Sequence, residues 1–243
     1  MQGGFTEVEL MVVLFAIVVL IGLVMLSQEE KRAREKAIRL RCISNLKAMG
    51  TAERVWANDH GGSFPGWQDI LKNPNQGALC WTNYAILMEK FGSDPNLFVC
   101  PSDERRPPTN LIVKGSPHEH AVLDFKDNST VSYFVSVGAS DTNPQSILNG
   151  DRNLGPGAIP DPNYGYSPAS GQGNDVAVPV SGPVSWSLKM HSHGNPSGAG
   201  NIVLGDGSAR QVASSAVSHY FAATTNWPTG YIPPVPSIRL IFP

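Results

Sequence analysis

The hydrophobic pattern of the chain begins with an uninterrupted apolar run from Leu10 to Leu26. Its 17 residues carry no charge, and a helix needs about 17 to 25 apolar residues to cross a bilayer. We therefore expect a transmembrane helix over residues 5–26. A cleaved secretory signal fits this pattern less well, because Met1–Gly4 contains no basic residue and no small-residue cleavage site follows Leu26.

A helical pattern continues beyond the apolar run. Residues 27–58 contain no proline and a single glycine, and they are rich in strong helix formers. Six mostly apolar positions recur at steps of three and four residues: Ile38, Cys42, Leu46, Met49, Ala52 and Trp56. This spacing predicts an amphipathic helix with a stripe on one face, and the stripe needs a partner surface. The pair Gly61-Gly62, followed by Pro65, predicts the end of this helix. The whole helix would be about 75 Å long at roughly 1.5 Å per residue.

Residues 59–243 predict a β-rich head with short strands, because most of the 24 glycines and 20 prolines lie there. Thr130–Val137 alternates polar and apolar residues, as a half-buried strand does. Asn201–Val212 reads as a hairpin with an Asp-Gly turn. A short helix is expected from Ser214 to Ala223, and a last edge strand over Ile238–Phe242. The expected fold class is α+β, with the long N-terminal helix packed on this head.

The distribution of charge changes the picture in two ways. Residues 1–58 hold 8 basic and 6 acidic side chains, whereas residues 59–243 hold 10 basic and 14 acidic ones. The acidic balance of the larger part argues against a nucleic-acid partner. Six basic residues follow the apolar run: Lys31, Arg32, Arg34, Lys36, Arg39 and Arg41. By the positive-inside rule they would place this flank in the cytoplasm, so a cytoplasmic head stays an alternative.

Three cysteines offer one disulfide. Cys80 and Cys100 both lie in the loop-rich part, and Cys42 lies in the helical pattern. If the head is exported, we expect a bond between Cys80 and Cys100, which would close a loop of about 20 residues and stabilise the fold by roughly 3 kcal/mol. Two unpaired thiols are the alternative, and Cys42 is left over in either case.

Candidate metal ligands are few. The chain has two His-x-His pairs, His118/His120 and His191/His193. They could in principle join Asp206 in a zinc or copper site, but loop histidines are more often simply solvated. Four loop acids could supply oxygen ligands for calcium, although no EF-hand spacing is present: Asp141, Asp151, Asp161 and Asp175. The chain has no phosphate loop, no Gly-x-Ser-x-Gly and no Rossmann fingerprint. We therefore expect no enzyme and no cofactor, with calcium as the one ion to consider.

The N-terminal residues resemble a known processing motif. Gly4-Phe5-Thr6, Glu9 and the apolar run after it are similar to the cleavage and methylation motif of type IV prepilins and type II secretion pseudopilins. The resemblance implies that a prepilin peptidase cuts after Gly4, removes residues 1–4 as a leader and methylates the new N-terminus, Phe5. It also implies that Glu9 pairs with the N-terminal amine of a neighbouring subunit during assembly, and an opposite charge is what a carboxylate in lipid needs. Glu7 stands where the family has an apolar residue.

Three pieces of the head resemble the heads of pseudopilin-like proteins of planctomycete and verrucomicrobial bacteria. They are Cys100–Asp103, Gly150–Asn153, and a histidine followed by Gly200–Gly207. Related sequences often place nine residues between that histidine and the Asp-Gly pair. In this chain 12 residues separate His193 from Asp206.

These resemblances imply a structural subunit of a type IV pilus-like or type II secretion pseudopilus filament. The implied partners are the prepilin peptidase, other pilin or pseudopilin subunits, the inner-membrane assembly platform, and the lipid bilayer before assembly. The implied location is the bacterial inner membrane, with a single membrane pass and an extracytoplasmic head. The alternative is a signal-anchored extracytoplasmic enzyme or carbohydrate-binding protein, in which the head alone carries the function.

Overall fold

The structure, a computed structural model, consists of a long apolar helix and a β-rich globular part, an α+β arrangement. It describes residues 6–65, 80–91, 94–107, 111–112, 122–123, 128–139, 143–167, 178–192, 196–225 and 238–243. The chain divides into two compact units, which we call the helical unit (Met1–Leu40) and the head unit (Arg41–Pro243). The head unit thus includes the last third of the long helix as well as the expected β-rich head.

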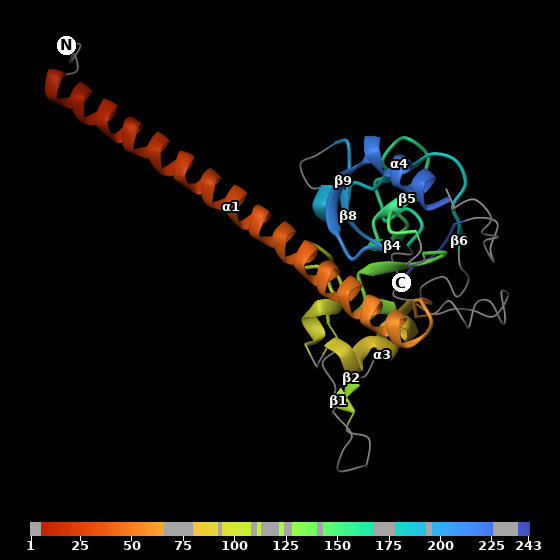
Figure 1. Cartoon of the computed structure of the whole chain (residues 1–243). Helices are drawn as coiled ribbons and strands as arrows, with labels where there is room; N and C mark the ends of the chain where they lie inside the picture. The colour runs from red at the N-terminus through yellow and green to blue at the C-terminus, as the bar shows by residue number, and fades with distance from the viewer. Residues whose placement is uncertain are drawn as a thin grey trace. The chain divides into compact units, whose positions relative to one another are not determined.

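Helix α1 (Glu7–Asp59) is a single helix of 53 residues, as the sequence predicts (Figure 1). It ends in a glycine cap. Gly61 and Gly62 have φ angles of 67° and 82°, and the Gly62 N–H donates to the carbonyl of Ala57 at 2.8 Å. Glycine takes such left-handed angles without the strain that a Cβ atom would cause, so the chain can turn sharply here.

A six-stranded antiparallel sheet forms the centre of the head unit, in the order β6-β10-β3-β4-β8-β9. Its strands are β3 (Tyr133–Val137), β4 (Ile147–Asp151), β6 (Val178–Pro179), β8 (Ala199–Leu204), β9 (Ala209–Ala213) and β10 (Arg239–Ile241). The predicted hairpin is confirmed as β8–β9, with its turn at Gly207 (φ 79°). The expectation of a last edge strand is wrong, because β10 lies between β6 and β3.

Shorter elements surround this sheet. The helices are α3 (Cys80–Phe91), which the sequence pattern does not predict, and α4 (Ser214–Thr225), which it does. Two further antiparallel pairs are β1 (Leu111–Ile112) with β2 (Val122–Leu123), and β5 (Leu154–Pro156) with β7 (Val184–Trp186). Three single turns of 3₁₀ helix complete the described elements: η1 (Pro95–Phe98), η2 (Asn128–Thr130) and η3 (Met190–Ser192).

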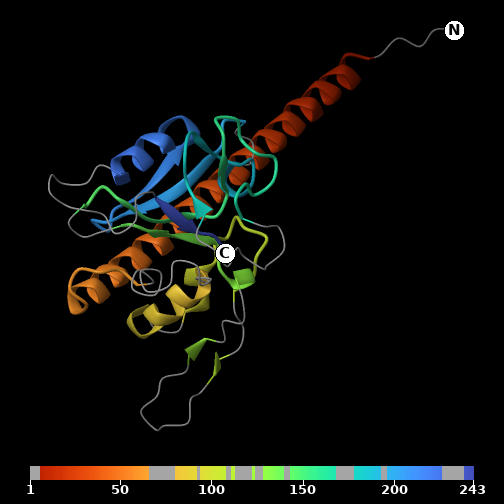
Figure 2. The ribbon, with the colours of Figure 1, turned by 90° about the vertical axis from the view of Figure 1, so that its right-hand side faces the viewer.

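The central sheet is buried on both faces. Along β3, Tyr133 and Val135 belong to one hydrophobic core, which also contains side chains of α1 and α3. Phe134, between them in the sequence, belongs to a second core with side chains of α4 and β7. Figure 2 shows α4 on one side of the sheet and the end of α1 on the other. The expected half-buried strand is therefore wrong: all five residues of β3 are buried, because both faces are covered.

The predicted stripe on α1 provides one wall of the first core. Cys42, Leu46 and Met49 are fully buried, whereas Trp56 is only partly covered. The helix also comes very close to the sheet at Gly50, where an added Cβ atom would lie 2.5 Å from a methyl carbon of Val203. Glycine at this position lets the backbone of the helix approach strand β8.

Candidate functional site

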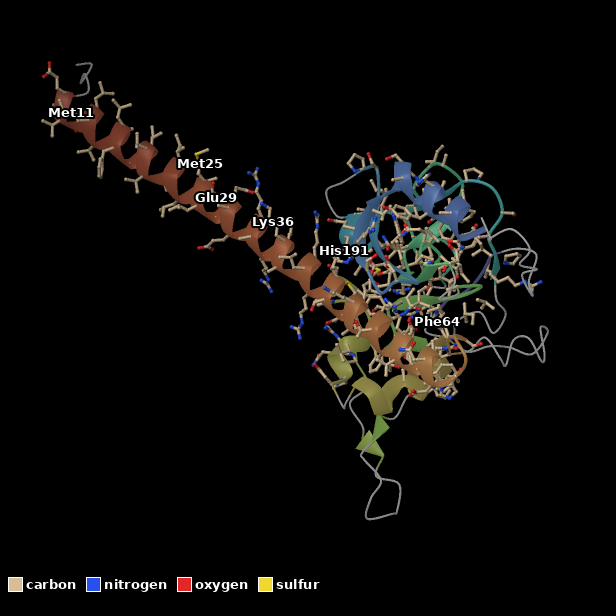
Figure 3. The ribbon with its side chains drawn as sticks, viewed as in Figure 1. Met11, Met25, Glu29, Lys36, Phe64 and His191 are labelled. Carbon is tan, nitrogen blue, oxygen red and sulfur yellow. A yellow bond between two sulfur atoms is a disulfide. The ribbon has the colours of Figure 1, made fainter. Side chains whose placement is uncertain are left out.

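The apolar run of α1 is exposed along its whole length in this single chain. Its large apolar side chains between Leu10 and Leu26 are 43% to 73% exposed, and Figure 3 shows them from Met11 to Met25, ahead of the charged positions Glu29 and Lys36. Among the described residues, α1 is the one helix long and apolar enough to cross a membrane, with a mean hydropathy of 3.1 over 18 residues. None of that window is buried. An apolar surface of this extent requires a lipid or protein partner.

Glu9, the predicted assembly residue, has a partner within its own chain. Its carboxylate accepts hydrogen bonds from the backbone N–H and the hydroxyl of Thr6, both at 2.9 Å, while the Glu9 N–H donates to Thr6 Oγ1 at 3.3 Å. This reciprocal pattern is a capping box, in which Thr6 is the N-cap and Glu9 the third helical residue. The spacing Thr-x-x-Glu was visible in the sequence. Gly4 and Phe5, the predicted processing residues, lie outside the described residues.

The disulfide joins Cys42 to Cys100, so the expected bond between Cys80 and Cys100 is wrong. Cys42 belongs to the buried stripe of α1, and Cys100 lies in the chain segment that follows η1. The bond therefore links α1 covalently to the head unit's own loops, across a sequence separation of 58 residues.

Cys80 is the free cysteine of the described chain, and it is buried. It begins helix α3 and points to strand β3, where its thiol donates to the carbonyl of Tyr133 at 3.1 Å. Burial raises the pKa of this thiol. A thiol that stays protonated and enclosed is a structural rather than a reactive group.

Two further buried side chains adjoin the disulfide. His191 Nε2 lies 3.2 Å from Cys100 Sγ and 3.4 Å from Asp151 Oδ2. We call Cys42, Cys100, Asp151 and His191 the cross-link cluster; one potential ligand atom of each lies within 4.8 Å of those of the others. All four residues are at most 2% exposed. They come from α1, from the loop after η1, from the end of β4 and from η3.

Neighbouring groups orient the cluster. Asp151 Oδ2 accepts hydrogen bonds from the backbone and the side-chain amide of Asn201, at 2.7 and 2.9 Å. On the other side, His191 Nδ1 lies 3.4 Å from Ser102 Oγ. The residue before the histidine, Met190, has a φ of 55°, which is rare for a residue with a side chain and directs the short η3 turn. Burial raises the pKa of Asp151 to about 8.

Residues of the motif Gly150–Asn153 each have a structural role in this region. Gly150 leaves room for Phe134, whose ring would lie 2.6 Å from an added Cβ atom. Arg152 forms a buried, two-pronged ion pair with Asp103, at 2.7 and 2.8 Å. Burial raises the pKa of Asp103, but the hydrogen bonds and the charge of Arg152 outweigh it and leave that pKa below its ordinary value. Asn153 donates to three backbone carbonyls.

The three head motifs singled out in the sequence thus meet at one place. Cys100–Asp103 supplies a sulfur and a carboxylate, Gly150–Asn153 supplies Asp151 and Arg152, and Asn201 comes from Gly200–Gly207. The histidine that joins them is His191. His193, the histidine that the sequence pattern offers for this position, lies outside the described residues.

The predicted metal ligands are mostly placed elsewhere or not described. His118, His120, Asp141 and Asp175 lie outside the described residues. Asp206 is a turn residue whose carboxylate accepts the Ser208 N–H at 2.8 Å. Asp161 likewise accepts the N–H of Asn163 in its own loop. The grouping of His191 with Asp151 and two cysteines was missed, because it joins segments that lie far apart in the sequence.

A small polar cavity reaches the cross-link cluster. Its volume is about 230 Å³, and Cys100 and Asp103 contribute to its lining. Three arginines also line it, namely Arg41, Arg105 and Arg106. The cavity therefore lies next to the cluster at Cys100, although Cys100 itself has no solvent-exposed surface.

A buried acid attaches α1 to the sheet. Glu53 is 1% exposed, and its carboxyl group accepts a hydrogen bond from Asn149 of β4 at 2.7 Å. Burial raises the pKa of Glu53 to about 8, and the bond from Asn149 only partly opposes this. The folded protein therefore keeps a proton on Glu53 that the unfolded chain releases near pH 4.5. Its stabilising contribution is present below that pH and is lost as the pH rises toward about 8.

The Glu53→Gln substitution is expected to remove this pH dependence. Thermal unfolding of the full chain near pH 5 and near pH 9 measures it: the melting temperature of the wild type should fall more between the two than that of the variant. The raised pKa of Asp151 also lowers the melting temperature between these two pH values, equally in both proteins. Burial keeps the nearby Cys80 and Tyr84 neutral. Glu35→Gln, at an exposed position of α1, is the matched control. Equal falls in wild type and Glu53→Gln would contradict the assignment.

In comparisons with known proteins, no protein-family model, no curated protein and no solved structure matches the chain.

Proposed function

We propose that this protein is a structural subunit of a type IV pilus-like or type II secretion pseudopilus filament. The observation that carries the proposal is helix α1, whose exposed apolar run and head-packed stripe form one helix from Glu7 to Asp59. The apolar surface would be covered first by lipid and then by the helices of other subunits. This exchange needs a surface that is apolar on all sides, which is how the run from Leu10 to Leu26 is built.

The attachment of α1 within the head unit supports a subunit rather than a tethered enzyme. Residues Cys42 to Ala57 are held by the first hydrophobic core, by the disulfide and by the Glu53–Asn149 hydrogen bond. Arg54 also donates to the backbone carbonyl of Asp206. A simple anchor would need no such set of connections. The side chains with catalytic potential, His191 and Asp151, are buried and held by neighbouring groups, which also favours a structural role.

The disulfide supports an extracytoplasmic head. Disulfides form and persist in oxidising compartments and are rare in the cytoplasm. We therefore place the protein in the bacterial inner membrane with its head outside the cytoplasm, against the orientation that the basic flank would favour. The partners on this proposal are the prepilin peptidase, other subunits and the inner-membrane assembly platform.

The processing step tests the proposal. The full chain is produced in a bacterium that carries a prepilin peptidase, extracted from its membrane and weighed by intact-mass spectrometry. We expect a product that begins at methylated Phe5. Gly4→Val should block cleavage, because the bulky side chain occupies the position before the cut bond, while Gly3→Val, one residue further away, should be cleaved as usual. An unprocessed wild-type chain that begins at Met1 would overturn the proposal.

A further inference from the structure

The cross-link cluster contains the donor set of a zinc site. Zn²⁺ is bound by cysteine sulfur, imidazole nitrogen and carboxylate oxygen, mostly by four ligands in a tetrahedron, and the cluster offers two sulfurs, one imidazole and one carboxylate. All four residues are buried, and they come from four different segments of the head unit.

Two distances lie near those of such a site: the His191–Asp151 distance falls within the expected range, and the His191–Cys100 distance is slightly shorter. In a tetrahedral zinc site, with Zn–S bonds of about 2.3 Å and Zn–N bonds of about 2.0 Å, neighbouring ligand atoms lie about 3.3 to 3.8 Å apart. His191 Nε2 lies 3.2 Å from Cys100 Sγ and 3.4 Å from Asp151 Oδ2. Once the sulfur–sulfur bond is absent, each sulfur can turn about its own Cα–Cβ bond, so the two sulfurs can separate to the same spacing.

The surrounding groups are also those that orient metal ligands. The Ser102 hydroxyl can hold the proton of His191 on Nδ1, which leaves the Nε2 lone pair directed at the cluster. The two bonds from Asn201 fix the carboxylate of Asp151. Its other oxygen, Oδ1, is buried and has no hydrogen-bond partner among the described residues, so this carboxyl group has acceptor capacity that its neighbours do not use.

We propose that the dithiol form of this protein binds one Zn²⁺ ion through Cys42, Cys100, His191 and Asp151. In a newly synthesised chain both cysteines are thiols, so no reductant is needed. Binding releases the two thiol protons and forms two zinc–thiolate bonds. In the oxidised chain the two sulfurs are bonded to each other, and a thiol or phosphine reductant must first supply two electrons and two protons. Zinc and the disulfide therefore exclude each other, and either one links α1 to the same loops.

The experiment compares the two forms of the full chain in detergent. One sample is kept under a phosphine reductant and the other is fully oxidised; both are incubated with Zn²⁺, freed of unbound metal and analysed for zinc content. We expect one zinc ion per chain in the reduced sample and none in the oxidised one. With Co²⁺ in place of zinc, the reduced sample should show the near-ultraviolet absorption of thiolate-to-cobalt charge transfer. A reduced wild-type protein without bound metal would overturn the proposal.

Variants separate this site from adventitious binding. The double variant Cys42→Ser/Cys100→Ser and the single variant His191→Ala should lose the zinc, and Ser102→Ala should weaken its affinity by about 10-fold to 100-fold. Cys80→Ser, which changes a buried thiol outside the cluster, should keep full binding. Loss of zinc from Cys80→Ser together with its retention in the double variant would show that the ion sits elsewhere.

A folding measurement covers the case in which the reduced chain does not fold without metal. Circular dichroism of the reduced wild type should then regain the spectrum of the oxidised protein when zinc is added, since metal binding to a folded site stabilises the fold. Alkylation of Cys42 and Cys100 should slow at the same time. If zinc restores neither the spectrum nor the protection of these two thiols, the proposal is wrong.

Discussion

The substitution Glu9→Gln is expected to abolish filament assembly while leaving membrane insertion and cleavage after Gly4 intact. On the proposed function, the carboxylate of Glu9 pairs in the apolar helix bundle with the N-terminal amine of Phe5 on a neighbouring subunit. Removing one partner of an ion pair that is shielded from water costs about 3 to 5 kcal/mol, which corresponds to more than about 100-fold in association. Filaments sheared from cells and counted by electron microscopy, relative to the membrane-bound subunit, measure the effect.

The capping box makes glutamine the informative replacement. A glutamine at the third helical position can still hydrogen-bond back to the Thr6 N–H, so it keeps the helix start but removes the charge. Thr6→Ala does the reverse: it keeps the charge and removes the N-cap, at a cost of about 0.5 to 2 kcal/mol to the helix. We expect Thr6→Ala to assemble nearly normally. Normal filaments from Glu9→Gln would mean that Glu9 serves the helix start alone, and the intersubunit pair would have to be given up.

The second large effect is expected from Cys42→Ser. Without the disulfide, which spans 58 residues, the unfolded chain gains conformational entropy. The folded state is therefore destabilised by about 4 kcal/mol. That is a large fraction of the roughly 5 to 15 kcal/mol by which a typical domain is stable. Denaturant unfolding of the full chain, followed by tryptophan fluorescence, measures the change in the free energy of unfolding. Filaments that carry this variant should also break more readily, because the covalent link between α1 and the head is gone.

Cys80→Ser is the control for this prediction. It alters a buried cysteine of the same domain without touching the disulfide, and a serine hydroxyl can still donate to the Tyr133 carbonyl. Its effect should stay below about 1 kcal/mol, the scale of one lost hydrogen bond. Peptide mapping without reductant provides a direct check: a linked peptide pair that contains Cys80 would contradict the disulfide seen here.

Local signals in the sequence were sufficient for the elements whose cause is local. The apolar run and the spacing of Leu46 and Met49 predicted α1, because a helical stripe follows from the 3.6-residue period alone. The Gly61-Gly62 pair predicted its end, and Asp206-Gly207 predicted the β8–β9 turn, since glycine is the residue that takes left-handed backbone angles at no cost. The helix α3 was missed, because its 12 residues lie next to glycine-rich and proline-rich stretches that favour turns.

Long-range placement decided the rest. The sequence of β10 resembles that of an edge strand, yet it became an inner strand because the short β6 pairs with its outer side. In the same way, β3 became buried on both faces because α1 covers one side and α4 the other. A pattern of alternation describes only one face of a strand, so it does not reveal what covers the second.

The sequence by itself determined the membrane-length helix, its amphipathic continuation and the β-rich composition of the head, because each depends on residues that are neighbours along the chain. Only the tertiary structure decided that Cys42 pairs with Cys100, that Glu53 is enclosed against Asn149, and that His191 meets Asp151. These contacts join residues from 40 to 96 positions apart, and no local pattern selects one distant partner over another. The packing of α1 against the sheet makes that selection, because it determines which buried side chains face each other.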